Sequence, residues 1–446
     1  MSGNLGLIVG VIILLVTIYM LIKQYETRMV LLASGFIMAI LALKPLDAFT
    51  GFSSGMTQAG LIQNICATLG FAAVLKITKC DLHLVNFMSG GLKYLKPALI
   101  PAIAIITYCI NIALPSAGGC AAAVGVIMIP LAISQGVHPA TAASAVMLGT
   151  FGSVLSPGNT HNNYVADLVK KTYTESSITV MDIISNHFFA AIVAILIGAT
   201  SLLIVSIIRK ENKGYDSTVW FSSGAAAAAG GSAPKQEEFK VNVFYALIPL
   251  LPIIALVAFS FGSVQEVLPW AKKFGVPHAM LTGAFLCLAA TRTNPQTATK
   301  EFFSGMGKGY ADIIGIIICA TVFIAGLKAL GVIDYCIELL KHSEGNAAGI
   351  ASIYGPFLLG IVSGSGDAAT LAFNGAVTPH AELFGLTIEG MGSAANVGGA
   401  LGRTMSPIAG AAIICAGLAR VNPMELTKRN AIGMIIASIS LVFTLL

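Results

Sequence analysis

Six polar side chains lie close together between two apolar segments of this 446-residue chain, in the stretch SVLSPGNTHNNYVAD. They are Ser156, Asn159, Thr160, His161, Asn162 and Asn163. Amides and hydroxyls donate hydrogen bonds to carboxylate oxygens without the desolvation cost of a full charge. We therefore favour an anion-binding segment over an aqueous loop at a membrane face. His161 can bind the ligand, carry a proton or cap a helix, and the sequence does not choose among these roles.

Arg403, in the stretch LGRTMSPIAG, is the one basic residue that we cannot assign to a membrane face. A buried arginine is expensive and usually functional, and its guanidinium grips a carboxylate through two parallel hydrogen bonds. We favour a role in the site, as a ligand for substrate or as the partner of Asp367, over a side chain that snorkels to the interface. Asn396, upstream on the same predicted span, can also face the site.

Asp367 stands at an interruption, SGSGD, within an apolar stretch. An acidic side chain in such surroundings invites protonation or cation binding, which makes it the leading candidate for ion coupling. Aspartate is also a good helix N-cap, and the two interpretations stand side by side. His161, Asn162 and Asn396 are further ion-coupling candidates, with H⁺ or Na⁺ as the coupling ion and a sodium site as the only metal site considered.

The composition requires lipid as the main solvent of this chain. Hydrophobic residues make up 56% of it, charged residues only 10%, and the mean hydropathy is +0.86. Soluble domains carry about 25% charged residues because their surfaces face water. The apolar runs are continuous rather than alternating, which disfavours a β-barrel. We predict an all-α polytopic membrane protein, whose 47 Gly and 17 Pro indicate close helix contacts and broken helices.

The chain divides into two halves that repeat. Residues 209–242, rich in Gly, Ala and Ser, read as a linker between halves at 1–208 and 243–446. Ser54-Gly55-Met56 recurs as Ser304-Gly305-Met306, and Ser156-Pro157 recurs as Ser406-Pro407, both 250 residues later by subtraction. Repeats of this size in a membrane chain indicate a secondary transporter fold.

Each half is predicted to contain five spans, one of them broken, and one re-entrant helical hairpin. The spans are residues 5–22, 28–44, 58–76, 140–167 and 183–208, then 243–260, 277–292, 310–330, 389–419 and 430–446. The hairpins are residues 97–134 and 347–381, and the broken spans are 140–167 and 389–419. We expect residues 5–22 to remain as a span because no basic segment or small-residue cleavage site accompanies them.

Five crossings per half place the two halves in opposite orientations. With both termini periplasmic and the linker cytoplasmic, seventeen basic residues fall in inner loops and seven in outer loops. This asymmetry obeys the positive-inside rule of a bacterial inner membrane. The repeats are therefore predicted to be inverted.

Four interruptions fall at matching places in the halves: the hairpin tips 115–119 and 363–367, and the span breaks 155–163 and 403–407. Non-helical backbone at membrane depth persists only where protein or a water-filled cavity satisfies its polar groups. Broken helices also present partial positive charge to an anion. We expect the four interruptions to meet in one binding site for a small anion.

Several classes of function are disfavoured by the motifs. The sequence has no GxxxxGK[ST], GxSxG or HExxH motif, so neither ATP hydrolysis nor an enzyme site is expected. The eight cysteines are scattered, and we interpret them as small buried hydrophobic residues. The net charge of +5 is interpreted from where the basic residues lie relative to the membrane, and not as a nucleic-acid-binding surface. A gradient-driven carrier without a cofactor is the favoured class, ahead of an ion channel or a membrane sensor.

The stretches GSGDAATLAF and LGRTMSPIAGAAIICAGLARVNPMELTKR resemble the anaerobic C4-dicarboxylate carriers of the DcuC type. The similarity is strong over residues 350–430 and weaker but collinear elsewhere. The paired hairpins and broken spans also resemble the wider ion-transporter superfamily, whose members are typically dimeric elevator carriers. The resemblance implies a homodimer that moves succinate, fumarate, malate or aspartate by exchange or cation symport. Another organic anion, such as an amino acid, a monocarboxylate or a tricarboxylate, remains the alternative substrate.

Carried over residue by residue, the resemblance implies contacts to the dicarboxylate and the ion at both tips and both breaks. These residues are Ser116, Gly118, Ser156, Asn159, Thr160, Ser363, Ser365, Gly366, Thr404 and Ser406. Together with Arg403 they form the predicted binding set.

Overall fold

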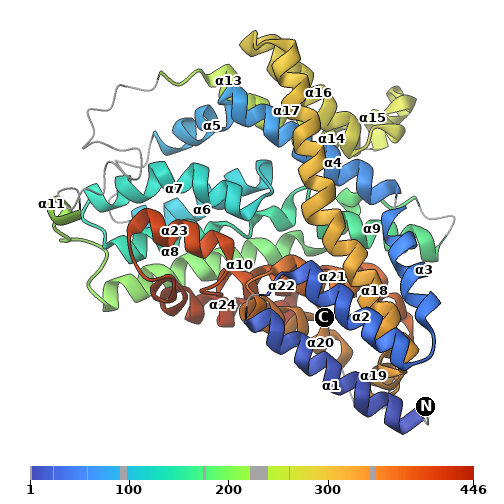
Figure 1. Ribbon diagram of the computed structural model, residues 1–446. Helices are drawn as coiled ribbons and strands as arrows, with labels where there is room; N and C mark the ends of the chain where they lie inside the picture. The colour runs from blue at the N-terminus through green and yellow to red at the C-terminus, as the bar shows by residue number, and fades with distance from the viewer. Residues whose placement is uncertain are drawn as a thin grey trace.

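The computed structural model of the chain is built of helices throughout the part that it describes (Figure 1). The predicted all-α membrane fold is confirmed. Residues 221–239, which form most of the predicted linker, lie outside the described residues. The described residues are 3–23, 25–57, 59–90, 98–173, 177–220, 240–260, 262–341 and 347–446.

The described helices occur in the following order along the chain. Those before the linker are α1 (Gly3–Ile22), α2 (Thr27–Leu41), α3 (Pro45–Met56), α4 (Ala59–Thr78), α5 (Cys80–Ser89), α6 (Leu99–Ala113), α7 (Ala117–Ser134), α8 (Pro139–Gly149), η3 (Gly152–Leu155), α9 (Thr160–Thr172), α10 (Val180–Ile208) and α11 (Ser217–Trp220). Those after it are α13 (Val243–Leu247), η5 (Ile248–Leu250), α14 (Leu251–Ser260), α15 (Gly262–Val267), η6 (Pro269–Lys273), α16 (Val276–Thr291), α17 (Pro295–Lys308), η7 (Gly309–Ile314), α18 (Gly315–Ala329), α19 (Val332–Lys341), α20 (Ala347–Ser363), α21 (Gly366–Ala376), η8 (Thr378–Phe384), α22 (Ile388–Thr404), α23 (Gly410–Ala419) and α24 (Pro423–Leu445).

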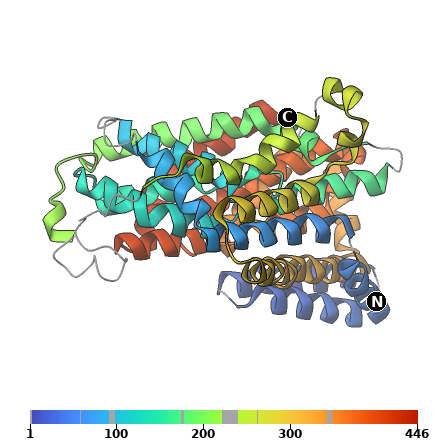
Figure 2. The ribbon, with the colours of Figure 1, turned by 90° about the horizontal axis from the view of Figure 1, so that it is seen from above.

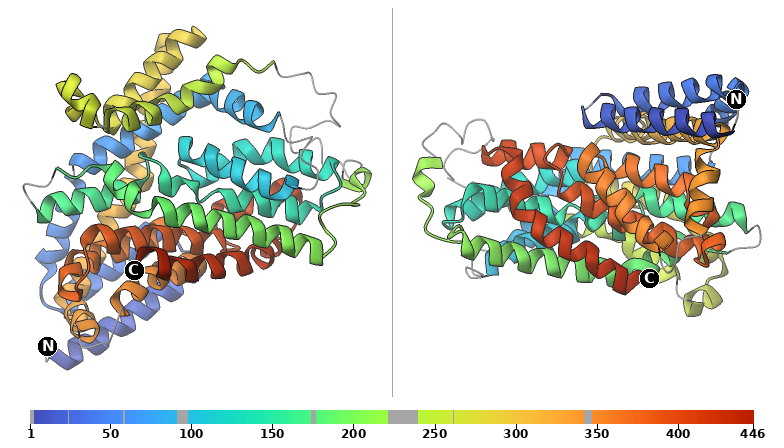
Figure 3. Two further views of the ribbon diagram at one scale, coloured as in Figure 1. Left: turned by 180° about the vertical axis from the view of Figure 1, so that it is seen from behind. Right: turned by 90° about the horizontal axis from the view of Figure 1, so that it is seen from below.

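Two groups of helices pack mainly among themselves. We call α1–α5 with α13–α19 the frame, and α6–α10 with α20–α24 the core. Within the core, helices from both halves interleave: α23 packs on α7, α24 on α10 and α22 on α9. Figure 2 shows α1, α2 and α18 of the frame as a layer beside the core, and Figure 3 shows the same separation from below. The two groups meet where α4 contacts α9 and α18 contacts α21.

One helix of the frame is longer than predicted. α17, η7 and α18 run without interruption from Pro295 to Ala329, whereas the sequence predicted a span only over 310–330. The helix begins early because Asn294 caps it, accepting from the amide of Gln296, and Pro295 occupies its first turn. Figure 1 shows it crossing the molecule from α16 to α2. Its middle segment η7 is a π-helical turn, a feature found often at functional sites.

Five helices among the described residues are long and apolar enough to cross a membrane by length and composition: 117–134, 139–172, 180–208, 295–329 and 423–445. The first of these is α7, which the sequence analysis assigned to a hairpin arm. Shorter apolar helices account for most of the other predicted spans, including α2, α4 and α16. That the two halves are inverted across the membrane stays a prediction.

Two helix pairs with short tips occupy the predicted hairpins. α6 and α7 are joined through residues 114–116, and α20 and α21 through residues 364–365. Gly364 has φ +70°, a left-handed conformation that glycine adopts without strain. The tips are therefore shorter than predicted, because helix α7 already starts at Ala117 and helix α21 at Gly366.

The two broken spans are also present, with shifted boundaries. The first break, residues 150–159, separates α8 from α9 and contains the short helix η3. The second break, residues 405–409, separates α22 from α23. Consequently Thr160–Asn163 form the first turn of α9, and Arg403 and Thr404 end α22, although the sequence placed all of them in the breaks.

Each broken span packs closely against the first helix of the hairpin in its own half. A Cβ on Gly152 would lie 2.1 Å from the Tyr108 carbonyl oxygen of α6, and one on Gly402 would lie 2.0 Å from the Phe357 carbonyl oxygen of α20. Only glycine allows such an approach of two backbones, the usual way in which membrane helices gain packing contacts. Both halves thus hold their hairpin and broken span together by the same means.

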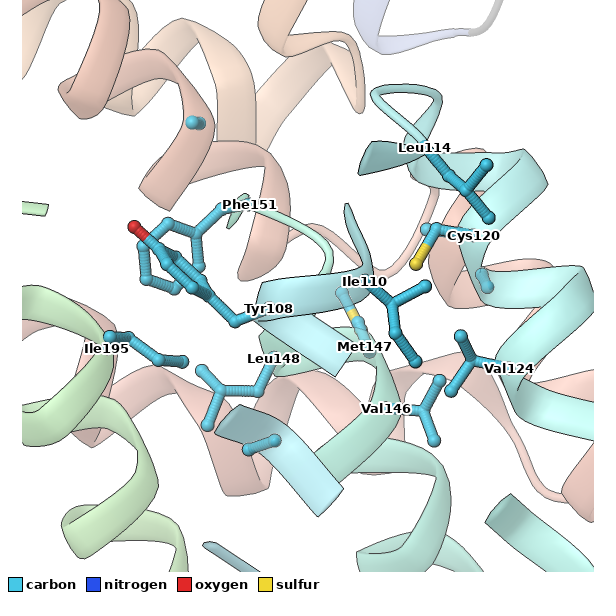
Figure 4. Close-up of a cluster of buried hydrophobic side chains, with 14 of the residues drawn as sticks. Tyr108, Ile110, Leu114, Cys120, Val124, Val146, Met147, Leu148, Phe151 and Ile195 are labelled. Atoms are coloured by element: carbon cyan, nitrogen blue, oxygen red, sulfur yellow. The ribbon is translucent and has the colours of Figure 1, made fainter. Parts of the chain in front are cut away.

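Side chains of α6, α7 and α8 interlock beside the first break (Figure 4). The rings of Tyr108 and Phe151 meet edge to face with centroids 5.0 Å apart. Met147 and Val146 of α8 pack with Ile110 of α6 and Val124 of α7 in the same cluster. Because lipid is as apolar as these side chains, close packing rather than water exclusion stabilises this arrangement. The cluster gives the first break a rigid support.

Candidate functional site

A cavity of about 420 Å³ lies where the frame meets the core. Its core wall is formed by both hairpin tips and by residues at both breaks, and its frame wall by α4 and the π-helical turn η7. The four interruptions that the sequence predicted to meet are therefore brought to one cavity. The predicted site residues that line it are Ser116, Gly118, Asn159, Thr160, His161, Ser365, Gly366, Asp367 and Arg403.

Four helices begin at the cavity wall. The first residues of α7, α9, α21 and α23, which are Ala117, Thr160, Gly366 and Gly410, all line the cavity. The N-terminus of a helix carries unpaired N–H groups and about half a positive charge. Four such ends around one space create an environment that favours an anion.

Arg403 adds a full positive charge to this wall. Its Nη2 donates to the carbonyl oxygen of Thr150, at the start of the first break, over 2.9 Å. A guanidinium carries five N–H groups, so this bond positions the side chain and leaves donors for a ligand. Gly366 makes room for it, because a Cβ there would lie 3.2 Å from the Arg403 Cβ.

His161 and Asp367 connect the two halves inside the cavity. His161 Nε2 lies 2.8 Å from Asp367 Oδ1, and the two residues come from the first turns of α9 and α21. The His161 side chain is 6% exposed and that of Asp367 55%. Asp367 thus has a histidine partner rather than the arginine partner considered from the sequence, and its carboxylate also faces the cavity.

The helix caps at the cavity are made by other residues than Asp367 and His161. Ser365 Oγ caps α21 by accepting from the amide of Ala368, and Asn159 Oδ1 caps α9 by accepting from the amide of His161. Ser116 Oγ caps α7 in the same way, accepting from Gly119. Since the capping roles are filled, His161 and Asp367 retain their side chains for each other and for a ligand.

Four predicted binding residues do not line this cavity. Ser156 and Ser406 are buried, and their hydroxyl oxygens accept from the backbone amides of Gly158 and Ile408. Thr404 is also buried and donates to the Ala400 carbonyl. Ser363 donates to the Leu359 carbonyl and lines a separate, apolar cavity between α20–α21 and the frame. These hydroxyls hold the tip and breaks in shape.

Asn162 and Asn396, both named as ion-coupling candidates, lie behind the cavity wall in a buried amide chain. Asn396 Nδ2 donates to Asn162 Oδ1 over 3.1 Å, and Asn374 Nδ2 donates to Asn396 Oδ1 over 2.9 Å. Thr378 continues the chain by donating to Asn374 Oδ1. The chain ties α9 of the first half to α22 and α21 of the second.

Side-chain donors bond to several carbonyl groups of the first break. Asn162 Nδ2 donates to the carbonyl oxygens of Val154 and Ser156, and His187 Nε2 lies 2.9 Å from the Val154 oxygen. Asn163 Nδ2 donates to the carbonyl oxygens of Pro157 and Asn159. A sodium ion at this break would have to displace these amide donors.

His187 and Asn111 are site-supporting residues that the sequence analysis missed. His187 reaches from α10 to the first break and to Ser393 of α22, and Asn111 Oδ1 accepts from the amide of Ser153. Both are polar residues within otherwise apolar helices, a pattern that indicates function in membrane proteins. That signal was present in the sequence, but no interruption of the apolar segment marked either position.

A second charged cluster lies at the far end of the core. Arg429 of α24 pairs with Glu211 over 2.6 Å and with Glu425 over 2.8 Å, and Thr141 of α8 also donates to Glu211. Burial raises the pKa of Glu211, but the hydrogen bonds from Arg429 and Thr141 prevail and lower it to about 2. This cluster does not line the cavity and joins α8, α24 and the segment after α10.

Solved structures with a similar fold are membrane transporters. The chain matches MtrF of Neisseria gonorrhoeae, from a class of antimetabolite efflux pumps, with a TM-score of 0.63 and 14% identity over 91% of this chain and 83% of that one. It matches the YdaH transporter of Alcanivorax borkumensis with a TM-score of 0.57 and 15% identity, over 89% and 86% of the two chains. This chain therefore shares the helical fold of these membrane proteins.

Sequence comparison narrows this class to one family. The chain belongs to the C4-dicarboxylate anaerobic carrier family, DcuC, whose family model matches residues 174–446. It is 42% identical to an uncharacterized transporter of Haemophilus influenzae over 299 residues, which is 66% of this chain and all of that one. It is 25% identical to the anaerobic C4-dicarboxylate transporter DcuC of Escherichia coli, over 96% and 94% of the two chains. The resemblance seen in the sequence is confirmed.

Proposed function

We propose that this chain is a secondary carrier that binds C4-dicarboxylates in the 420 Å³ cavity and moves them across the inner membrane. The observation that carries the proposal is the convergence of four helix N-termini and Arg403 on one space. Helix ends and a guanidinium recognise carboxylates at two positions, as a four-carbon diacid requires. Membership of the C4-dicarboxylate carrier family supports the same substrate class.

Counterflow in proteoliposomes tests this function directly. Vesicles loaded with unlabelled succinate should accumulate labelled succinate or fumarate transiently, and empty vesicles should not. Competition by a panel of amino acids, monocarboxylates and tricarboxylates separates a C4-dicarboxylate carrier from a carrier of another organic anion. If no di-, mono- or tricarboxylate exchanges under any gradient, the proposal is wrong.

An elevator movement of the core against the frame is the mechanism that we favour. The cavity lies at the boundary between the two groups, so displacement of the core would carry the site with it. Asn64 of α4 donates to Asn163 of α9 across this boundary. In a chain without native cysteines, disulfide formation between Asn64→Cys and Asn163→Cys should arrest transport, and reduction should restore it. Full transport by the cross-linked protein would contradict this movement.

Proton coupling through His161 and Asp367 follows from the same geometry. The pair shares one hydrogen bond, lies on both halves and borders the ligand space. A proton on the pair removes negative charge from the cavity when a dianion enters. We favour H⁺ over Na⁺ because the amides of Asn162 and Asn163 already donate to the Val154 and Pro157 carbonyl oxygens of the first break, where they compete with a cation. Accumulation driven by a pH gradient, with sodium absent, tests this choice.

The homodimer, the periplasmic termini and the cytoplasmic linker remain part of the proposal. The elevator-carrier resemblance supports the dimer, and the distribution of Lys and Arg supports the orientation. Accessibility of single cysteines at Lys44 and Lys213 to a membrane-impermeant reagent checks the orientation. The first should react from the periplasm and the second only after permeabilisation.

A further inference from the structure

The ionisable side chains around the cavity include more carboxylates than a purely anionic ligand would need. Among the described residues that line it, Arg403 is the one guanidinium, and Asp312 and Asp367 are two carboxylates. Asp367 has His161 as its partner. Asp312 therefore needs a separate explanation, because a carboxylate repels a dicarboxylate ligand.

Asp312 stands on the frame side of the cavity, opposite the core residues. It lies on the π-helical turn η7 together with Ile313, which also lines the cavity, and its side chain is 69% exposed. The wider π turn makes local room within a helix and is common at functional sites. The position therefore presents a charge to the ligand space rather than to a packed interface.

The nearest cation does not fully neutralise this carboxylate. Arg28 Nη1 lies 3.7 Å from Asp312 Oδ1, beyond hydrogen-bond distance. The short contacts of Arg28 go elsewhere: Nε lies 2.5 Å from Glu26 Oε1, and Nη1 donates to the Ala311 carbonyl over 2.8 Å. Arg28 thus fixes the π turn while the carboxylate of Asp312 keeps its capacity to accept hydrogen bonds.

We propose that Asp312 is a specificity-determining residue, whose carboxylate accepts the ammonium group of an α-amino dicarboxylate held by Arg403 and the helix N-termini. The inference rests on the proposed function. An ammonium group beside Asp312 pairs the otherwise repulsive charge at close range, and a substrate without that group leaves it only the 3.7 Å ion pair with Arg28. The cavity thereby distinguishes amino-bearing C4 diacids from plain ones.

Uptake of labelled L-aspartate and labelled succinate by the same proteoliposome preparation tests this role. Asp312→Asn should lower the aspartate-to-succinate uptake ratio at least tenfold, with succinate uptake unchanged or increased. Asp312→Glu, which retains the carboxylate, should keep most of the wild-type ratio. Asp334→Asn, an exposed acidic residue of α19 away from the cavity, is the matched control and should leave the ratio unchanged.

The measured ratio separates this inference from the proposed function. If wild-type protein takes up neither substrate, the proposed function fails. If it takes up succinate but not aspartate, or if Asp312→Asn changes both rates equally, the role of Asp312 is overturned while the carrier function stands. Asp312→Ser provides a second variant, should the Asn variant not reach the membrane, and should shift the ratio in the same direction.

Discussion

The first and second breaks occupy equivalent places in the two halves but differ in chemistry. At the first break, residues 150–159, neutral amides satisfy part of the backbone: Asn162 and Asn163 donate to four carbonyl oxygens. The second break is apolar, and its contribution is the charged Arg403 that precedes it. The two breaks thus differ in role: the first is held by amide contacts, and the second contributes a charge.

The charged side chains of the site are held by contacts between the two halves of the chain. Arg403 of the second half anchors on the Thr150 carbonyl of the first break, and His161 of the first half pairs with Asp367 of the second. A charge in a membrane interior needs a fixed partner because water is not available to reorganise around it. The first break therefore provides the fixed backbone that holds the charged side chains in place.

Removal of the arginine should have the largest effect. We expect Arg403→Ala to lower succinate uptake by about 100-fold or more, because a desolvated charge that pairs with a ligand contributes several kcal/mol. Arg403→Lys should also be impaired, since it cannot pair with a carboxylate through two bonds. Labelled uptake, normalised to protein in the membrane, measures this. Lys300→Ala, an exposed basic residue of α17, should transport normally.

Separation of the His161–Asp367 pair should uncouple transport rather than abolish it. Asp367→Asn and His161→Gln each remove one of the two groups proposed to carry the coupled proton but leave Arg403 and the helix N-termini in place. We expect loss of accumulation driven by a pH gradient. Counterflow, which needs no net proton movement, should stay within about tenfold of wild type because the groups that bind the anion remain. Equal loss of both activities would make the pair structural.

Asn162→Ala tests how much the amide contacts at the first break contribute to stability. This change removes the acceptor of the buried Asn396 amide and one donor to each of the Val154 and Ser156 carbonyl oxygens, which should lower the free energy of unfolding by about 1–3 kcal/mol. Thr404→Val, beside the second break, removes only a bond to the carbonyl of its own helix and should have a smaller effect. Thermal unfolding in detergent compares the two. A larger loss for Thr404→Val would reverse our assignment of rigidity.

The smallest effect should come from the ion-pair cluster, which lies outside both breaks. The pKa of Glu211 is lowered to about 2 in the folded protein, so the carboxylate contributes stability that is fully present above its usual pKa of 4.5. That contribution should be lost as the pH falls from 4.5 towards 2. Glu211→Gln should therefore be less stable than wild type at pH 6, and the difference should shrink in acid. Transport at neutral pH should change little.

Much of the candidate site was readable from sequence because breaks in apolar segments are conspicuous. The interruptions at Ser116, Asn159, Ser365 and Arg403 each contribute residues that line the core wall of the cavity. The boundaries shifted by a few residues, since serine and asparagine caps start helices earlier than the polar runs suggest. Ser156 and Ser406 show what the sequence does not distinguish. A serine at a break can bond to the backbone or to a ligand, and its residue type is the same in both cases.

The sequence by itself determined the membrane setting, the helical class and the family, because these depend on hydropathy and motif. Only the tertiary structure decided the partners: Asp367 with His161 and not with Arg403, Asn162 behind the wall and not in it, and Asp312 on the opposing frame. Those outcomes depend on contacts between segments far apart in the chain. Side-chain direction across such contacts is set by helix packing, which no local pattern encodes.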